Sequence, residues 1–286
     1  MKRVTRIFLG IACASIGIGL LLAIIGFVLG GKIVSHGENT YDYSYKVENI
    51  KSIDLDVEYG YVKILKGDEF TAEVENVVEN GFQGYVEGDT WHLKQNGKIT
   101  DTLNIFGLNI PFSFGWFGHH DSDYPKITIT VPEDFIAEEF EIELGAGEIK
   151  VEEMDTKVAE VSIGAGKMDV RNMNVTDEIS CDVGAGELII RELDTKKAKF
   201  ECGVGSIKVD GKVAGDLDAD CGMGEMDIIL NGNEEEYNYN VSCGVGNINL
   251  NGHNYSFSSN NRIKNESSIG TIDLDCSVGS LKLRFK

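Results

Sequence analysis

The chain has 286 residues, with 26 Lys and Arg against 47 Asp and Glu, and a formal net charge of −21. Four of the 26 basic residues lie within residues 1–32, whereas no acidic residue precedes Glu38, so residues 33–286 carry a net charge of −25. Such a surface repels polyanions, which argues against binding to nucleic acid, anionic lipid or teichoic-acid-like polymers.

The chain opens with a basic segment and a long apolar one. Lys2, Arg3 and Arg6 precede residues 7–29, a run of 23 residues without a charge. A helix of about 20 apolar residues crosses a bilayer. A cleaved signal peptide is the alternative, but its apolar region is usually about 7–15 residues long and is followed by a small-x-small site, which is missing here. We therefore predict a transmembrane helix over 7–29, with residues 1–6 in the cytoplasm and the remainder outside.

Residues 30–50 are predicted to form a polar stalk rich in tyrosine. From residue 51 apolar and polar residues alternate, and glycines interrupt them, which predicts strands and turns. An extracellular domain over 51–286 is expected to begin here.

An aromatic insert at 103–118 breaks this alternation. Its sequence LNIFGLNIPFSFGWFG has little charge and no clear period. One interpretation is a loop that contacts a partner or a membrane, because exposed aromatic groups mark contact sites. The other is a loop that covers the exposed strands at the end of the domain. The candidate contact residues are Phe106, Phe112, Phe114, Trp116 and Phe117.

After a strand at 126–132 that ends in proline, one phrase recurs six times. Each copy reads Gly-x-Gly, a polar residue, then apolar–any–apolar, and the copies begin at Gly145, Gly164, Gly184, Gly203, Gly222 and Gly244. Counting the first glycine as position 0, the residues before it alternate with period two, and the alternation resumes after the second glycine with shifted parity. Each repeat therefore predicts a strand, a glycine corner and a second strand.

A repeat of about 20 residues predicts stacked coils rather than one globular core. Outward charges support stacking in register, since Glu148, Lys167 and Glu187 alternate in sign along position +3. Faded copies at 55–64 and 276–283 are expected to cap the stack. The predicted fold is all-β: a β-solenoid of about 20-residue coils with Gly-x-Gly corners, preceded by one transmembrane helix.

Five of the six cysteines fall at inward positions of the repeats, whereas Cys13 lies in the apolar segment. They are best explained as small buried residues, and disulfides between neighbouring coils remain an alternative. At position −2, Asp182, Glu201 and Asp220 form a predicted acidic ridge. A solvated ridge and a cation-binding ridge are both compatible with the sequence.

Motifs for catalysis or cofactor binding are missing from the sequence. The Gly-x-Gly phrase lacks the third glycine and the helix of a dinucleotide fingerprint, and no nucleophile elbow, zinc motif or phosphate loop occurs. We therefore predict no enzyme activity, no cofactor, no metal and no catalytic residue. A carbohydrate-active solenoid enzyme is a weaker alternative, because such enzymes need long loops around a cleft.

Three features together resemble a family of bacterial surface proteins named putative adhesins, which carry a β-strand repeat domain of unknown function. They are the N-terminal span, the strand Ile127-Thr-Ile-Thr-Val-Pro132 and the recurring Gly-x-Gly-x-Ile-x-Val phrase, and the resemblance covers about residues 47–286. It implies a membrane-anchored β-solenoid that faces the cell exterior, in some members linked to envelope-stress signalling. It supplies no catalytic residues.

The expected function is that of a single-pass membrane protein with a non-enzymatic adhesin or interaction scaffold outside the cell. Its partners are expected to be the membrane, through the N-terminal helix, and a protein or cell-wall component. An accessory role in cell-envelope stress sensing is the alternative.

Overall fold

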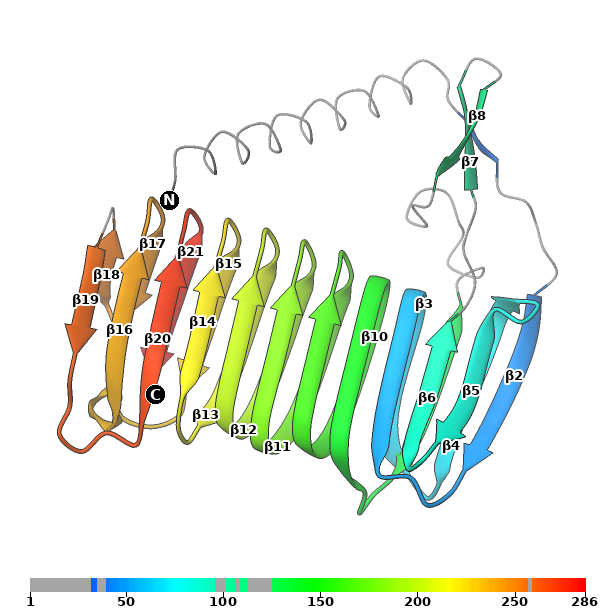
Figure 1. Cartoon of the computed structure of the whole chain (residues 1–286), viewed down its shortest axis with the longest axis horizontal. Helices are drawn as coiled ribbons and strands as arrows, with labels where there is room; N and C mark the ends of the chain where they lie inside the picture. Colours follow the sequence, from blue (N-terminus) through cyan, green and yellow to red (C-terminus); the bar gives the residue numbers. More distant parts are fainter. Residues whose placement is uncertain (1–31, 35–39, 96–100, 106–107, 113–124, 257–258) are drawn as a thin grey trace. The chain divides into compact units, whose positions relative to one another are not determined.

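The computed structural model describes residues 32–34, 40–95, 101–105, 108–112, 125–256 and 259–286 (Figure 1). The chain divides into two units, residues 1–38 with 98–120 and residues 39–97 with 121–286. We describe each unit separately. The predicted cytoplasmic and transmembrane segments, 1–6 and 7–29, lie outside the described residues.

The first unit contains a small antiparallel sheet. It consists of β1 (Lys32–Val34), β7 (Asp101–Ile105) and β8 (Leu108–Phe112), in the order β1-β7-β8. Ile33 pairs with Leu103, so the segment that follows the predicted span forms a sheet with the aromatic insert. Of the candidate contact residues, Phe112 has a described backbone, which pairs with Asp101. Phe106, Phe114, Trp116 and Phe117 lie outside the described residues.

The second unit is a solenoid-like stack of parallel rungs (Figure 1). Each rung has one segment before the Gly-x-Gly corner and one after it. The segments before the corners pair to form what we call the first sheet, and the segments after the corners form the second sheet. The corners line one side of the stack, the corner edge, and the turns that connect one rung to the next line the opposite side, the return edge. The long strands are β3 (Ser52–Gly67), β10 (Ile136–Ile163), β11 (Lys167–Val183) and β12 (Glu187–Cys202). Shorter strands complete the later rungs: β13 (Ser206–Val213), β14 (Leu217–Cys221), β15 (Glu225–Leu230), β16 (Tyr237–Cys243), β17 (Asn247–Leu250), β20 (Gly270–Cys276) and β21 (Ser280–Phe285).

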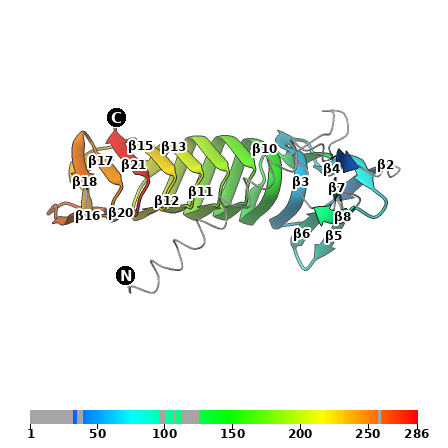
Figure 2. The same ribbon diagram turned by 90° about the horizontal axis from the view of Figure 1, so that it is seen from above.

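The core lies between the two sheets and is built from columns of equivalent side chains. Seen from above, the chain winds around a narrow interior (Figure 2). One column, at position +4, consists of Ile127, Val62, Ile149, Met168, Leu188, Ile207, Met226, Leu281 and Ile248. Every side chain in it has a relative exposure of 0%. The period-two pattern thus places one face of every strand in a continuous apolar interior, which confirms the stacking predicted from the repeats.

The rungs do not follow chain order at the C-terminal end. Strand β20 pairs with β14 on one side and with β16 on the other, and β21 lies likewise between β15 and β17. The faded copy at 276–283, predicted to cap the stack, is therefore an internal rung, and the sixth strict copy lies outside it. Beyond that copy the sheets end in the antiparallel strands β18 (His253–Ser256) and β19 (Ser259–Ile263).

The other end of the stack is also closed by antiparallel strands. The rung before β3 consists of β6 (Thr90–Gln95) in the first sheet and β9 (Lys126–Pro132) in the second. Outside it lie β5 (Phe82–Glu87), β4 (Phe70–Val78) and β2 (Thr40–Val47). The predicted stalk thus contributes β2 to the sheet, and the faded copy at 55–64 is an internal rung as well.

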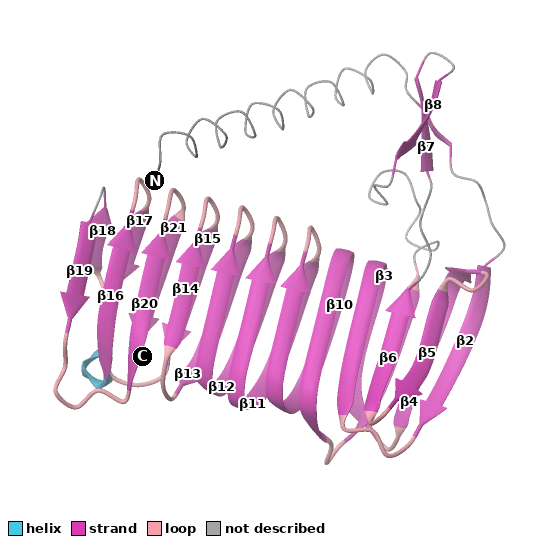
Figure 3. Ribbon diagram, viewed as in Figure 1, coloured by secondary structure: helices cyan, strands magenta, loops and turns pink. Residues whose placement is uncertain are grey.

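The described residues are all-β, apart from a single 3-10 turn at Glu234–Glu236, drawn in cyan in Figure 3. Within this described part, no helix has the length and hydrophobicity needed to cross a bilayer.

Candidate interaction surface at the corner edge

The corner glycines allow neighbouring rungs to approach closely. A Cβ atom built on Gly205 would lie 2.1 Å from the carbonyl oxygen of Gly186 in the preceding rung. At Gly147 the same approach, 2.1 Å to Gly60 O, combines with a φ of +118°. The sequence suggested that these glycines serve a bend or bulge. At Gly205 the requirement is space between stacked backbones, because its φ is not in the left-handed region.

The residue between the two glycines, at position +1, points outward. Its N–H donates to the carbonyl of the first corner residue of the neighbouring rung, as from Met223 to Gly203 at 2.7 Å and from Val278 to Gly222 at 2.8 Å. In the β3 rung this residue is Tyr59, and in the next three rungs it is Ala146, Ala165 and Ala185. In the four outer rungs that follow it is again larger than alanine, and we call Val204, Met223, Val278 and Val245 the corner ridge, in their order along the stack.

The corner ridge is exposed. Val204 has a relative exposure of 59%, Met223 48%, Val278 52% and Val245 68%. Isolated exposed apolar residues are ordinary, but a continuous row at a spacing of about 4.8 Å forms a patch of the kind that binds partners. The row is continuous only because the rung formed by the C-terminal strands, which carries Val278, lies between the rungs of Met223 and Val245.

A row of carboxylates runs beside the corner ridge in the first sheet. Position −2 carries Asp182, Glu201, Asp220 and Asp275 on four consecutive rungs, paired in register, and we call these the carboxylate row. Partial burial raises the pKa of Asp220, and the nearby charges of Asp275 and Glu201 raise it further. Among the described residues, Glu201 is paired with Lys199 at 2.5 Å, whereas Asp182, Asp220 and Asp275 have no ion-pair partner.

The predicted acidic ridge is therefore real as an arrangement of side chains, and it extends to Asp275. The described residues contain no group of three or more His, Cys, Asp or Glu side chains placed to hold a metal ion. The carboxylates of the ridge point outward, and each lies on a different rung. Together they form a line of negative charge.

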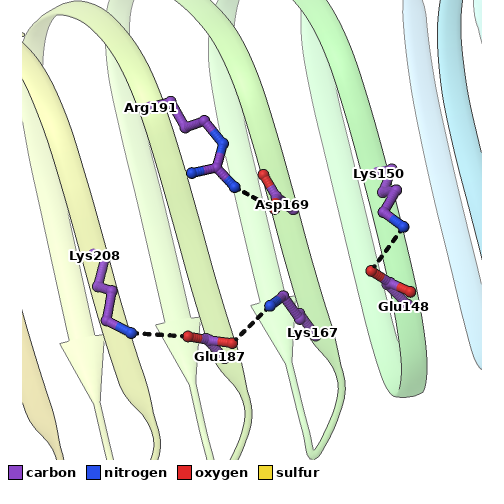
Figure 4. Close-up of polar contacts among 7 residues, drawn as sticks. All are labelled: Glu148, Lys150, Lys167, Asp169, Glu187, Arg191 and Lys208. Atoms are coloured by element: carbon purple, nitrogen blue, oxygen red, sulfur yellow. Dashed lines mark hydrogen bonds and ion pairs between the residues drawn. The ribbon is translucent and has the colours of Figure 1, made fainter.

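The second sheet contains ion pairs that join neighbouring rungs (Figure 4). Glu187 accepts from Lys167 at 2.9 Å and from Lys208 at 3.0 Å, and Arg191 contacts Asp169 at 2.6 Å. Lys150 lies in register with Asp169 but pairs with Glu148 at 3.1 Å. The alternation of charge predicted along position +3 is confirmed, although the pairing also crosses to position +5. Beside the corner ridge, position +3 reads Ser206, Glu225, Ser280 and Asn247.

A polar hollow of about 590 Å³ lies among Arg191, Asp194, Asp210 and Lys286, away from the corners. Both of its basic residues are already engaged, because Lys286 pairs with Asp210 at 2.6 Å and Arg191 pairs with Asp169. The carboxylate row and the exposed corner ridge lie side by side at the corner edge, which makes that edge the stronger candidate for binding.

The aromatic insert leaves the stack at the same edge. The side chain of Gln95 accepts from the Tyr59 N–H at 2.9 Å, and the carbonyl of Pro125 accepts from the Tyr61 N–H at 2.9 Å. Gln95 and Pro125, the described residues on either side of residues 96–124, therefore both lie at the corner edge of the rung formed by β6 and β9. Strand β2 also begins on this side, because Thr40 pairs with Val78, three residues beyond the Glu75–Lys126 pair.

The five cysteines in the described residues are buried and free. Cys202, Cys221, Cys276 and Cys243 form one column at position −1, and each has a relative exposure of 3% or less. The inward placement predicted from the sequence is confirmed. Burial raises the pKa of the Cys276 thiol to about 12.

Comparison with known proteins agrees with this architecture. The family model described as Toastrack DUF4097 matches residues 50–277. The chain belongs to this family. The match begins just before β3 and ends at Ser277, in the corner of the inserted C-terminal rung, so it covers most of the stack of rungs. Among curated proteins, none matches this Toastrack chain.

Several solved structures also match this chain. A putative cell adhesion protein from Clostridium sporogenes is 15% identical, with a TM-score of 0.38 over 87% of this chain and 100% of its own. A putative adhesin from Bacteroides fragilis is 12% identical, with a TM-score of 0.45 over 87% of this chain and 99% of its own. A putative adhesin from Parabacteroides distasonis is 11% identical, with a TM-score of 0.38 over 87% of this chain and 98% of its own.

The sequence did not reveal the corner ridge. Its residues can be assigned to position +1 from the sequence. The copy beginning at Cys276 was predicted to cap the stack, however, so the sequence did not predict that Val278 lies between Met223 and Val245. The signal available was the change from alanine in the first three strict copies to valine or methionine in the last three.

Proposed function

We propose that this chain is a non-enzymatic surface protein, anchored by a transmembrane helix at 7–29, whose stack of rungs binds a partner at the corner edge. In this role it is an adhesin-like interaction scaffold. The observation that carries the proposal is the exposed corner ridge, a continuous apolar row that a protein without a partner has reason to avoid.

Anchoring and orientation are supported by the uncharged segment and by the basic residues that precede it. The test is fractionation of cells that make the full chain. We expect the protein in the membrane fraction, released by detergent but not by high salt or alkali. Protease added to intact cells is expected to digest residues 40–286. Release by alkali, or protection from the protease, would contradict the proposal.

Partner binding is tested by placing a photo-crosslinking residue at Met223 in the full chain on cells. The control position is Lys196, whose side chain is 67% exposed at the return edge. We expect adducts from Met223 that do not form from Lys196. Equal labelling from both positions would remove the support for a binding surface at the corners.

A role in envelope-stress sensing is a second candidate, and one observation favours it. Strand β1 follows the predicted span by two residues and pairs with β7 of the insert. A change at the membrane would therefore reach the insert through backbone hydrogen bonds. Recovery of a membrane sensor protein with the full chain, lost when residues 101–112 are deleted, is the expected result for this role.

A further inference from the structure

The corner edge combines two features that point to one class of partner. The corner ridge offers apolar contact, and the carboxylate row runs along one flank of it. On three rungs the two lie three residues apart in the chain: Glu201 and Val204, Asp220 and Met223, Asp275 and Val278. On the other flank, position +3 carries a single carboxylate, Glu225, among Ser206, Ser280 and Asn247.

We propose that the corner ridge and the carboxylate row together bind one face of a cationic amphipathic α-helix. This inference rests on the proposed interaction role and specifies its partner. The helix would place an apolar stripe on Val204, Met223, Val278 and Val245, and Lys or Arg side chains from one flank on Asp220 and Asp275.

The spacing of the rungs favours a helix over an extended strand. Neighbouring rungs are about 4.8 Å apart, and an α-helix presents one turn every 5.4 Å. Over the four rungs of the ridge this difference accumulates to about 2 Å, which flexible side chains absorb. Side chains on one face of a strand recur about every 6.8 Å, which would leave the fourth contact about 6 Å out of register. About ten residues of helix span the whole ridge.

Charge complementarity favours a basic partner at the corner edge over an anionic bilayer or a second copy of the chain. Asp182, Asp220 and Asp275 have no ion-pair partner among the described residues, so basic side chains would find available carboxylates. A bilayer containing anionic lipid would be repelled by the same row. A second copy of the chain would bring an identical row of negative charge against the first.

The binding test uses the full chain in nanodiscs of phosphatidylcholine, with empty nanodiscs as background. The probe is a fluorescent helix of about 18 residues made from Leu and Lys, with a single Leu stripe. Two further probes separate the contributions: one keeps the stripe and replaces Lys with Gln, and the other keeps Lys and replaces the stripe with Gln. We expect binding of the first probe, measured by anisotropy, and at least about tenfold weaker binding of the other two.

Variants locate the binding. Asp220→Asn with Asp275→Asn removes two charges from the row, and Met223→Ser with Val278→Ser removes apolar surface from the ridge. The matched control, Glu133→Gln with Asp134→Asn, removes two exposed charges from a turn at the return edge. Each surface double variant is expected to weaken binding about tenfold. The ridge variant should keep the parent melting midpoint because its positions are exposed, whereas the row variant should keep or slightly raise it because the change relieves like-charge contact. Salt should weaken binding in the parent chain and much less in the row variant.

Several outcomes would overturn the proposal. Equal affinity of the row variant and the control would show that the carboxylates do not select the partner. The same conclusion would follow if the probe whose Lys residues are replaced by Gln bound as tightly as the Leu and Lys probe. In the Met223 crosslinking experiment, an adduct with lipid, with a second copy or with a protein lacking a basic helix would overturn the cationic helix and leave the interaction role intact. The absence of any specific adduct would instead reject the interaction role.

Discussion

The least exposed ion pair among the described residues of the stack shows how single residues stabilise the return edge. The side chain of Lys66 is 8% exposed and contacts Asp155 at 2.9 Å, and it also donates to the carbonyls of Glu133 and Phe135 at 3.3 Å. Asn174 donates to the same Asp155 carboxylate at 2.8 Å. Burial would raise the pKa of Asp155, but the hydrogen bonds from Asn174 and Lys66 outweigh it and hold the pKa below its usual value.

The substitution Lys66→Met is expected to lower the free energy of unfolding by about 2 kcal/mol, because it leaves a half-buried carboxylate without its cation. Since the pKa of Asp155 is lowered in the folded state, its contribution is present above the unfolded pKa and is lost as pH falls through the folded value. Denaturant unfolding at pH 7 and at pH 3 measures this. The deficit of the variant should shrink at pH 3, and a constant deficit would assign the effect to packing.

At the corners, Gly205→Ala is expected to destabilise the stack by about 3 kcal/mol. Its Cβ would lie 2.1 Å from Gly186 O, so two rungs must separate locally. The control is Ala185→Ser, an outward change at position +1, expected to stay within about 0.5 kcal/mol. Thermal unfolding of the two variants provides the comparison, and similar midpoints would show that the corner backbone is not closely stacked.

At the scale of elements, the C-terminal rung is a wedge between two rungs that precede it in the chain. Strands β20 and β21 hydrogen-bond on both sides, to β14 and β15 and to β16 and β17. The outer rung therefore depends on the last residues of the chain for its place in the stack. A stack in chain order would lose only its final rung when those residues are disturbed.

The substitution Leu274→Ala tests this dependence, because Leu274 in β20 has a relative exposure of 1%. We expect a loss of about 3 kcal/mol from the cavity. Hydrogen exchange should accelerate together in β20 and in β16, although β16 lies earlier in the chain. Protection of β16 that stays at the parent level would contradict the wedge arrangement.

At the scale of the whole molecule, the two sheets of the stack differ in how their charged side chains are paired. The second sheet pairs its charges, as Arg284 does with Asp227 at 2.7 Å. In the first sheet, Asp218 lies in register with Asp273, and partial burial, together with that neighbour, raises the pKa of Asp218. A carboxyl whose folded pKa is raised favours folding below its unfolded pKa, and this advantage is lost as pH rises through the folded value.

Neutralising one member of this pair should therefore stabilise the protein at pH 7. Asp273→Asn is expected to raise the free energy of unfolding by about 0.5 kcal/mol through relief of like-charge contact. The matched change Asp227→Asn should lower it, because it breaks the contact with Arg284. Thermal midpoints at low salt measure both effects, and a fall in the midpoint for Asp273→Asn would refute the argument.

Much of this architecture could be predicted from the sequence, because the recurring Gly-x-Gly phrase marks the equivalent positions of successive rungs and so defines their register. The buried column from Ile149 to Ile248 and the inward cysteines follow directly from period two. The order of the rungs could not be predicted, because Ser277 and Val278 carry no mark that distinguishes an inserted rung from a terminal one. The corner ridge was missed for the same reason. The aromatic residues Phe106, Phe114, Trp116 and Phe117 lie outside the described residues, so their proposed contact role remains a prediction.

The wedged final rung also has a consequence for synthesis. The carbonyl of Lys286 accepts from the Gly232 N–H at 3.3 Å, and its own N–H donates to Leu230 at 3.0 Å. While residues 270–286 are still inside the ribosome, β14 and β16 have no partner between them. Completion of the stack must therefore wait until these residues emerge, and a product that lacks them presents two unsatisfied sheet edges to quality-control proteases.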